Sequence, residues 1–125
     1  MIKIALVSGS LFGMLAVIFG AFGAHALKKR LTVDQLKSYE TGVKYQMYHA
    51  LVLLVIGFGF TGDSALANYA VYSFVIGTFL FSFSIYGLVL SDARGKKLRF
   101  LGPVTPLGGL ILVLGWLLLL LQVLD

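Results

Sequence analysis

Four long stretches without any Asp, Glu, Lys or Arg limit what this chain can fold into more than any other feature. They cover residues Ile4–Ala24, Tyr45–Gly62, Ser64–Ser91 and Phe100–Leu124. A helix that spans the hydrocarbon core of a bilayer needs roughly 20 consecutive apolar residues. Hydrophobic residues make up 59% of the 125 residues and charged residues only 12%, which is typical of membrane proteins rather than of soluble domains. The sequence therefore predicts four transmembrane helices.

Together these stretches predict one all-α domain over residues 1–125, an integral membrane four-helix bundle. We expect its spans at about residues 4–27, 43–62, 65–90 and 104–124. Cysteine is absent, which excludes disulfides, thiolate metal sites and covalent haem attachment. We recognise no nucleophile beside a base, no paired carboxylates and no phosphate-binding loop, so the sequence does not predict an enzyme.

Nine of the ten basic residues lie in two of the three connections between the expected spans. Residues 28–44 hold five of them and residues 92–99 hold four, whereas the connection around Asp63 holds none. Because cytoplasmic loops are enriched in Lys and Arg, we expect residues 28–44 and 92–99 to be cytoplasmic and both termini to lie outside. Lys3 alone disagrees. The net charge of +5 is then explained by orientation and by contact with anionic lipid headgroups, and nucleic acid is not an expected partner.

The stretch GAFGAHALKKR, residues 20–30, admits two interpretations: the cleavage site of a signal peptide, or the end of a membrane helix. The apolar run before it exceeds the roughly 7–15 residues of a signal-peptide core. Cleavage would also leave Lys28, Lys29 and Arg30 at the start of an exported segment, against the charge distribution. We therefore expect an uncleaved first helix.

A short amphipathic interfacial helix is expected between the first two spans, over residues 32–44. Thr32 and Gln35 have the spacing of a capping box, in which each side chain bonds the other residue's backbone N–H at the start of a helix. From there Tyr39 and Val43 recur on one helical face. Basic amphipathic segments commonly lie at the membrane interface, and we expect this one to lead into the second span. A contact with lipid or with a partner protein is the alternative.

Small residues recur at four-residue spacing in several of the expected spans, and without side-chain bulk two helix backbones can approach each other. The pattern predicts close packing within the chain or between copies of it, and a homo-oligomer is one consequence. The glycines concerned are Gly9, Gly13, Gly20, Gly77, Gly108 and Gly115.

Polar residues inside the spans gather, by helix geometry, near the end where the basic connections lie. A polar side chain within a span is expected to face the protein interior or a ligand rather than lipid. We treat these residues as a candidate ligand-binding site, with a closed hydrogen-bond network between helices as the alternative. They are His25, Tyr45, Gln46, His49, Tyr86 and Thr105.

Two prolines precede the fourth span. Pro106 fits the first position of a helix with Thr105 as its N-cap residue, because proline lacks an N–H group that would be unpaired there anyway. Pro103 and the neighbouring glycines then disfavour regular helix upstream. A non-helical backbone at membrane depth has to be buried in protein or face water, so this segment is an expected part of the candidate site. An ordinary helix start at the interface is the alternative.

Four separated segments follow one another in an order that spans essentially the whole chain. They are GAFGAHAL (20–27), YETGVKYQMYHALVLL (39–54), LFSFSIY (80–86) and GPVTPLGG followed by GW (102–109 and 115–116). They resemble the small inner-membrane proteins of the bacterial family called domain of unknown function four-two-three, whose animal relative is transmembrane protein 256. The resemblance implies a four-span protein of the bacterial inner membrane and brings no substrate or catalytic residue. One departure is Phe83, where the family pattern has a glycine.

Three classes of function remain open. The first, which we favour, is the handling of a small solute or lipid at the cytoplasmic face by an oligomer. No Asp or Glu lies inside an expected span, so a proton carrier would have to be a histidine. The second is a structural or assembly partner in the membrane. The third is a protein that binds haem b or a divalent metal through His25 and His49, and two ligands without carboxylate or cysteine support make a poor metal site.

Overall fold

The computed structural model describes residues 1–60 and 64–125, and every regular element in this part of the chain is a helix. Helix α1 spans Ile2–Ala24 and leads through a 3₁₀ turn at Leu27–Lys29 (η1) into α2, which spans Val33–Gly59. The connection around Asp63, which we expect on the exterior side, lies outside the described residues.

The third helical rod has an irregular centre. α3 spans Ala65–Thr78, α4 spans Ser84–Ala93, and a π-helical segment at Phe79–Phe83 (η2) joins them without a break. In a π-turn the backbone hydrogen bond runs from residue i to i+5, so the turn holds one residue more than an α-helical turn. A 3₁₀ turn at Arg99–Leu101 (η3) then precedes α5, which spans Val104–Leu124.

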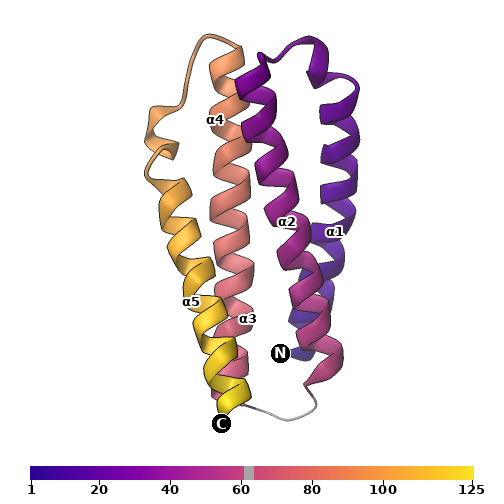
Figure 1. Cartoon of the computed structure of the whole chain (residues 1–125), viewed down its shortest axis with the longest axis vertical. Coiled ribbons are helices and arrows are strands. Elements are labelled where there is room, and N and C mark those ends of the chain that lie inside the picture. The colour runs from indigo at the N-terminus through magenta and orange to yellow at the C-terminus, as the bar shows by residue number, and fades with distance from the viewer. Residues whose placement is uncertain (61–63) are drawn as a thin grey trace.

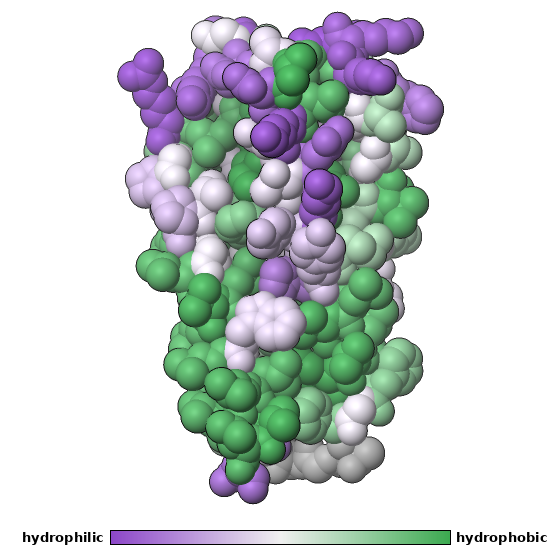
Figure 2. Space-filling view, viewed as in Figure 1, coloured by the Kyte–Doolittle hydropathy of each residue, from purple (hydrophilic) through white to green (hydrophobic). Residues whose placement is uncertain are grey.

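Figure 1 shows the four helical rods side by side, with α1 packed along α2 and α3 packed along α5. The connection from α1 to α2 and the connection from α4 to α5 lie at one end of the molecule, and both termini lie at the other end. Since these two connections carry most of the basic residues, their end of the molecule is hydrophilic, as the purple surface at the top of Figure 2 shows. We call it the basic end.

Three helical stretches are long and apolar enough to cross a membrane: Ile2–Lys29, Ala65–Ala93 and Arg99–Leu124. They contain the expected first, third and fourth spans. α2 is not in this set, because its first half is rich in charged and polar residues. The expected second span, residues 43–62, is therefore helical as far as Gly59, and its last two residues lie outside the described part of the chain.

The segment expected as a separate amphipathic helix, residues 32–44, is the first part of α2. The predicted capping box is confirmed: Thr32 Oγ1 accepts a hydrogen bond of 3.1 Å from the Gln35 N–H, and Gln35 Oε1 accepts one of 3.0 Å from the Thr32 N–H. No break separates the segment from the rest of α2. Tyr39, on its apolar face, is buried in the protein.

The fourth span starts at residue 104 as expected, but the expected N-cap residue is wrong by two positions. α5 begins at Val104 and follows directly on Pro103, so Thr105 is not the N-cap residue and Pro106 is the third residue of the helix. The first four N–H groups of a helix have no partner within the helix, so a proline at this position costs no backbone hydrogen bond. Regular helix thus begins earlier than the two prolines suggest.

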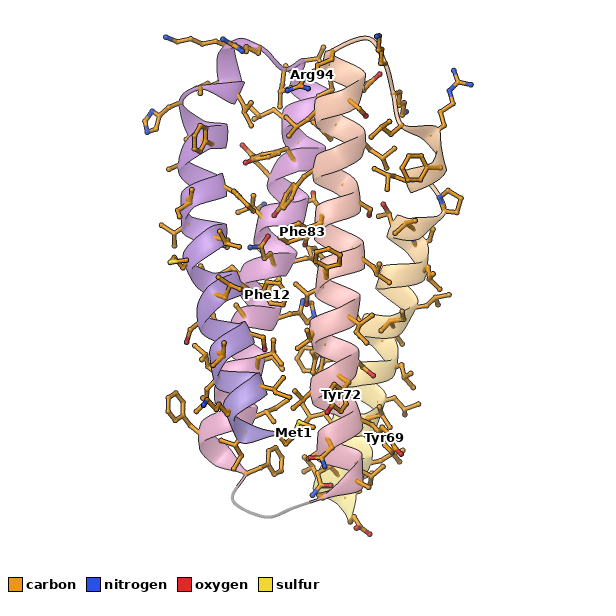
Figure 3. The ribbon with its side chains drawn as sticks, turned by 180° about the vertical axis from the view of Figure 1, so that it is seen from behind. Met1, Phe12, Tyr69, Tyr72, Phe83 and Arg94 are labelled. Atoms are coloured by element: carbon orange, nitrogen blue, oxygen red, sulfur yellow. The ribbon has the colours of Figure 1, made fainter. Side chains whose placement is uncertain are left out.

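Apolar side chains fill the space between the rods. Phe74 of α3 and Leu53 of α2 are fully buried in this core. Phe83 lies in η2, and the centroid of its ring is 6.4 Å from that of the Phe12 ring. Figure 3 shows both rings between α1 and the third rod. The bulk of Phe83 therefore fills the interior at the point where the third rod is π-helical.

In the interface between α1 and α2, a small-residue position allows close approach of the backbones. A Cβ atom at Gly9 would lie 2.9 Å from the carbonyl oxygen of Ala50, which is shorter than such atoms tolerate. Gly13 and Gly20 face the same helix, but a Cβ atom there would meet its nearest neighbour at 3.8 Å and 3.5 Å, which are ordinary contacts. Gly9 alone of the three depends on the missing side chain.

The other three expected packing glycines lie between the third rod and α5. A Cβ atom at Gly108 would overlap the backbone of Phe81 in η2, so the two helices touch backbone to backbone there. Gly77 lies against Leu112, and Gly115 packs against the buried ring of Phe74. All of these contacts are made within one chain.

Candidate functional site

The fully buried side chain of Gln46 joins three of the four rods. Its Nε2 donates a hydrogen bond of 2.8 Å to the carbonyl oxygen of Phe12 in α1. Its Oε1 accepts one of 2.7 Å from the hydroxyl of Tyr86 in α4. Two of the expected site residues, Gln46 and Tyr86, are thus brought together and satisfy each other.

Two further hydrogen bonds close the polar interior around this pair. The Tyr39 hydroxyl donates a bond of 2.6 Å to the carbonyl oxygen of Phe19, and the Ser82 hydroxyl donates one of 2.7 Å to the carbonyl oxygen of Gly42. Buried polar groups that are fully paired stabilise a unique packing of helices. Gln46 and Tyr86 therefore have the geometry of the closed network, which was the alternative interpretation of the sequence.

His49, one helical turn after Gln46 on α2, is buried, and both of its ring nitrogens are paired. The Trp116 indole N–H donates a hydrogen bond of 3.1 Å to Nε2, and Nδ1 lies 2.7 Å from the carbonyl oxygen of Tyr45. Because an indole can only donate, Nε2 is the acceptor and the ring proton is on Nδ1. The side chain of Tyr45 is exposed beside this pair.

The remaining two expected residues lie apart from this pair. Thr105, in the first turn of α5, shares a hydrogen bond of 2.6 Å with Ser84 of α4. His25 is exposed at the end of α1, in a shallow depression that it shares with Lys28 and Lys29. The structure therefore does not bring His25 and His49 together, and the described residues contain no group of three His, Cys, Asp or Glu side chains that could hold a metal.

The expected residues also differ in depth. Thr105 and Trp116 are 116 − 105 = 11 residues apart on α5, which corresponds to roughly 16 Å along the helix axis. His49, the partner of Trp116, thus lies far from the level of Thr105. The candidate residues are therefore spread along the helices and do not share one level.

The surface between α2 and α5, which we call the seam, holds two grooves. The deeper-lying one, the apolar groove, has a volume of about 540 Å³. Its polar atoms come mainly from the side chains of Tyr45, Tyr48, His49 and Trp116, and the rest of its lining is apolar. It is lined by Tyr45, Tyr48, His49, Leu51, Val52, Phe81, Gly109, Leu112, Val113 and Trp116.

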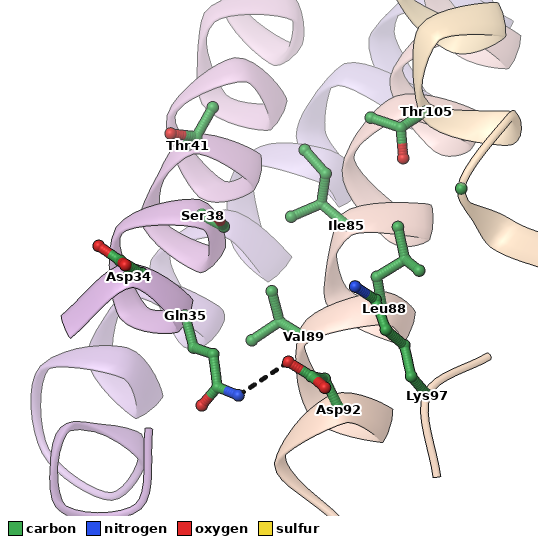
Figure 4. Close-up of a pocket in the computed structure, with 11 residues that line it drawn as sticks. Asp34, Gln35, Ser38, Thr41, Ile85, Leu88, Val89, Asp92, Lys97 and Thr105 are labelled. Atoms are coloured by element: carbon green, nitrogen blue, oxygen red, sulfur yellow. Dashed lines mark hydrogen bonds between the residues drawn. The ribbon is translucent and has the colours of Figure 1, made fainter. Parts of the chain in front are cut away.

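The second groove, the charged groove, opens at the basic end and has a volume of about 450 Å³ (Figure 4). Its walls come from the first turns of α2, from α4 and from the entry to α5. Hydroxyl groups and three charged side chains surround an apolar floor. It is lined by Asp34, Gln35, Ser38, Thr41, Ile85, Leu88, Val89, Asp92, Lys97, Gly102 and Thr105.

The two grooves follow each other along the seam with an offset of one helical turn in every wall. Tyr45 lines the apolar groove four residues after Thr41 lines the charged groove, and Gly109 likewise follows Thr105. In Figure 2 a stripe of polar and weakly hydrophobic residues runs from the basic end towards the middle of this face, between two strongly hydrophobic areas. The surface of the seam thus changes from charged at the basic end to apolar near the middle of the helices.

Four residues of the seam were missed as candidates from the sequence: Asp34, Asp92, Lys97 and Trp116. A signal for the acidic pair was present, since the chain has only five acidic residues and these two lie in the connections that hold nine of its ten basic residues. Trp116 is the only tryptophan and interrupts a run of aliphatic residues. Their convergence depends on contacts between helices that are distant in the sequence.

The apolar helices and the hydrophilic basic end define a small all-helical membrane protein. The side chains of Gln46, His49 and Tyr86 are paired within the chain, whereas the buried Thr78 hydroxyl has no hydrogen-bond partner among the described residues. A surface seam remains accessible. The chain belongs to the family described as "Protein of unknown function (DUF423)", whose model matches residues 19–109. This confirms the family that the four sequence segments indicated.

Proteins similar to this chain over nearly their whole length are named as membrane proteins. A UPF0382 membrane protein of Staphylococcus epidermidis is 39% identical over 98% of this chain and 97% of its own length. UPF0382 membrane protein SH2409 of Staphylococcus haemolyticus is 38% identical over 96% and 94% of the two chains. UPF0382 membrane protein SAB0533 of Staphylococcus aureus is 38% identical over 94% and 92%. No solved structure matches this chain.

Proposed function

We propose that the seam binds one phospholipid of the surrounding bilayer, with the headgroup in the charged groove and an acyl chain in the apolar groove. The observation that carries this proposal is the succession of the two grooves along α2 and α5, one helical turn apart. A phospholipid has the same order of chemistry, from a charged head to an apolar tail. The protein thereby handles a lipid at the basic end.

Three amphipathic aromatic side chains support the proposal. Tyr45 is 41% exposed, Tyr48 is 53% exposed and Trp116 is 48% exposed, and all three line the apolar groove. Tyr and Trp usually lie at the level of the headgroups, where their polar atoms reach water. Trp116 is instead about midway along α5. Aromatic rings that line an open groove halfway along the helices can pack against an extended acyl chain.

We place the protein in the bacterial inner membrane with all four rods crossing it as a four-helix bundle. α2 can cross despite its polar residues, because it packs along α1 and the side chains of Gln46 and His49 are paired inside the protein. The basic end then faces the cytoplasm by the positive-inside rule, near anionic headgroups, and both termini lie outside. Tyr69 and Tyr72, exposed near the opposite end in Figure 3, fit the aromatic belt of the outer interface.

This orientation is tested with single cysteines, since the chain has none of its own. Lys96→Cys at the basic end and Asp125→Cys at the C-terminus are labelled in intact cells with a thiol reagent that does not cross the membrane. We expect labelling of Asp125→Cys and protection of Lys96→Cys. The reverse pattern would invert the orientation.

The homo-oligomer expected from the small residues has less support than lipid binding. Gly9, Gly77, Gly108 and Gly115 all make their close contacts within one chain. The small-residue faces that suggested association between copies are therefore already packed against other helices of the same chain. A second copy is nevertheless the natural competitor of a lipid for an apolar groove, and the experiment below distinguishes them.

Fluorescence of the single tryptophan tests lipid binding. A phospholipid with bromine atoms on its acyl chains quenches indole fluorescence on contact, and it is titrated into the purified protein in a detergent that does not quench. Because Trp116 lines the apolar groove, we expect quenching that saturates at a fixed ratio of lipid to protein. Quenching that only rises in proportion to the added lipid would contradict the proposal, since the lipid would then act as bulk solvent.

Gly109→Leu is the matched variant for this titration. A Cβ atom at Gly109 would meet only the Phe81 ring, at 3.7 Å, so added bulk enters the groove without disturbing helix packing. We expect the saturable quenching to be lost in Gly109→Leu and retained in Leu110→Phe, which adds bulk on an exposed face of the same helix. If Gly109→Leu instead converts a dimer into a monomer in solution, the seam binds a second copy and the lipid proposal is wrong.

A further inference from the structure

We infer that the charged groove selects a headgroup that carries a primary ammonium beside a phosphate, as in phosphatidylethanolamine. This inference rests on the proposed lipid binding and specifies which lipid is bound. It comes from the kinds of charge that meet in the charged groove and from the contacts that position them.

The lining of the charged groove has the opposite charge balance to the end of the molecule that surrounds it. Nine basic residues lie in the two connections near this end, yet the groove is lined by two carboxylates, Asp34 and Asp92, and by one ammonium group, that of Lys97. In residues 1–60 and 64–125 none of these three side chains forms an ion pair with another residue. A ligand with one positive and one negative group would complement them.

One of the carboxylates is held in place by the capping box of α2. The Gln35 Oε1 accepts the backbone N–H of Thr32, which orients the amide so that its Nε2 donates a hydrogen bond of 3.0 Å to Asp92 Oδ2. Figure 4 shows this bond at the mouth of the charged groove. The second oxygen of Asp92 accepts no hydrogen bond from the described residues and can accept one from a ligand.

The positive group lies on the same wall of the groove as Asp92 and faces the wall of α2, which carries Asp34. In Figure 4 the side chain of Lys97 runs along the wall formed by α4, with its nitrogen directed into the groove. An ammonium group binds a phosphate as a point charge, and the hydroxyl of Ser38 offers a further donor on the facing wall. The Thr41 hydroxyl already donates to the carbonyl oxygen of Lys37, at 3.1 Å. The carboxylates bind a ligand ammonium through its N–H donors, and this requires a primary amine rather than a quaternary one.

Three brominated phospholipids with identical acyl chains test this selection by Trp116 quenching. Their headgroups are ethanolamine, choline, whose nitrogen has no N–H group, and glycerol, which has no positive charge. We expect the quenching midpoint of the ethanolamine lipid to lie about tenfold below those of the other two, which is the effect of losing one charge-assisted hydrogen bond. Equal saturable quenching by all three would leave lipid binding standing and would overturn the headgroup assignment. Absence of saturation with all three would overturn both.

Charge-neutralising variants locate the selection in the charged groove. We expect Asp92→Asn and Lys97→Gln each to reduce the preference for the ethanolamine lipid by about tenfold. Glu40→Gln and Lys96→Gln are the matched controls, because these side chains are exposed at the same end and do not line the groove. If Lys96→Gln and Lys97→Gln have equal effects, the preference is caused by the overall charge of this end of the protein, and the headgroup assignment is wrong.

A soluble competitor separates a lipid from a free solute of the same chemistry. Glycerophosphoethanolamine has the same headgroup and no acyl chain, so it should not displace the brominated lipid at concentrations near the lipid's own midpoint. Full displacement at those concentrations would assign the charged groove to a free zwitterion and would overturn the choice of a lipid.

Discussion

The α1–α2 interface and the seam between α2 and α5 use opposite sides of the same helix in different ways. Towards α1, α2 presents Ala50 opposite Gly9, so the two backbones touch and polar side chains such as Gln46 are closed off. Towards α5 it presents Tyr45 and Tyr48, whose rings line an open groove. The size of the residues that face each other, and not their polarity, decides whether a polar group in this protein is sealed or accessible.

The largest effect is expected from closing the gap at the tight interface. Gly9→Ala should lower the free energy of unfolding by about 2–3 kcal/mol, because the new methyl group would lie 2.9 Å from the Ala50 carbonyl oxygen and the helices would have to separate. Thermal and denaturant unfolding in detergent, followed by circular dichroism, measures it.

Two controls complete this comparison. Gly13→Ala adds the same methyl group to the same helix, where it would meet its neighbour at 3.8 Å, and Gly109→Ala adds it in the seam at 3.7 Å. Both should change the stability by less than about 0.5 kcal/mol. If Gly9→Ala behaves like these two, the α1–α2 interface is no tighter than the seam.

A smaller effect is expected from opening the closed polar network. Gln46→Leu leaves the Tyr86 hydroxyl and the Phe12 carbonyl oxygen without their partner, so we expect a loss of about 2 kcal/mol in unfolding free energy. Gln122→Leu is the same substitution at a half-buried position near the chain termini, where the side chain bonds Ser64. Gln122→Leu should lower the free energy of unfolding by clearly less than Gln46→Leu does. Equal losses in the two variants would show that the buried network contributes no more than a partly exposed hydrogen bond.

The smallest effect is expected at the seam itself. Trp116→Phe removes the donor to His49 Nε2 and should cost about 1 kcal/mol of stability. Nitrogen NMR of the imidazole should also show a changed balance between its two tautomers. Tyr48→Phe, at an exposed position in the same groove, should leave both the stability and the tautomer unchanged. An unchanged tautomer in Trp116→Phe would mean that the indole does not orient His49.

Local features of this fold could be predicted from the sequence, because their partners are near in the chain. The capping box needs only Thr32 and Gln35, three residues apart, and three of the four expected spans follow from an absence of charge. The N-cap residue of α5 was misassigned because two prolines both satisfy the local rules for a helix start. The contact that distinguishes them, between Thr105 and Ser84, is a tertiary one.

The site could not be predicted in the same way. Helix spacing gives the depth of His49 relative to the nearest lysine, but its partner Trp116 is 67 residues away, and Gln35 and Asp92 are 57 residues apart. Which polar residues meet depends on the rotation of each rod about its own axis. A small error in the assumed rotation of a helix turns a buried position into an exposed one. The six candidates, which look alike in the sequence, therefore divide in the structure into buried pairs, residues of the seam and the isolated His25.

The π-helical segment Phe79–Phe83 also bears on how this gene can change in length. Because a π-turn holds one residue more than an α-helical turn, removing one residue from it would restore a regular α-helix and leave the residues that follow in nearly the same orientation. Removing one residue from the regular part of α4 before Tyr86 would instead rotate Tyr86 by about 100° and turn it away from Gln46. We therefore expect descendants of this gene to tolerate the loss of one codon within Phe79–Phe83 and to lose such changes by selection in the α-helical segments on either side.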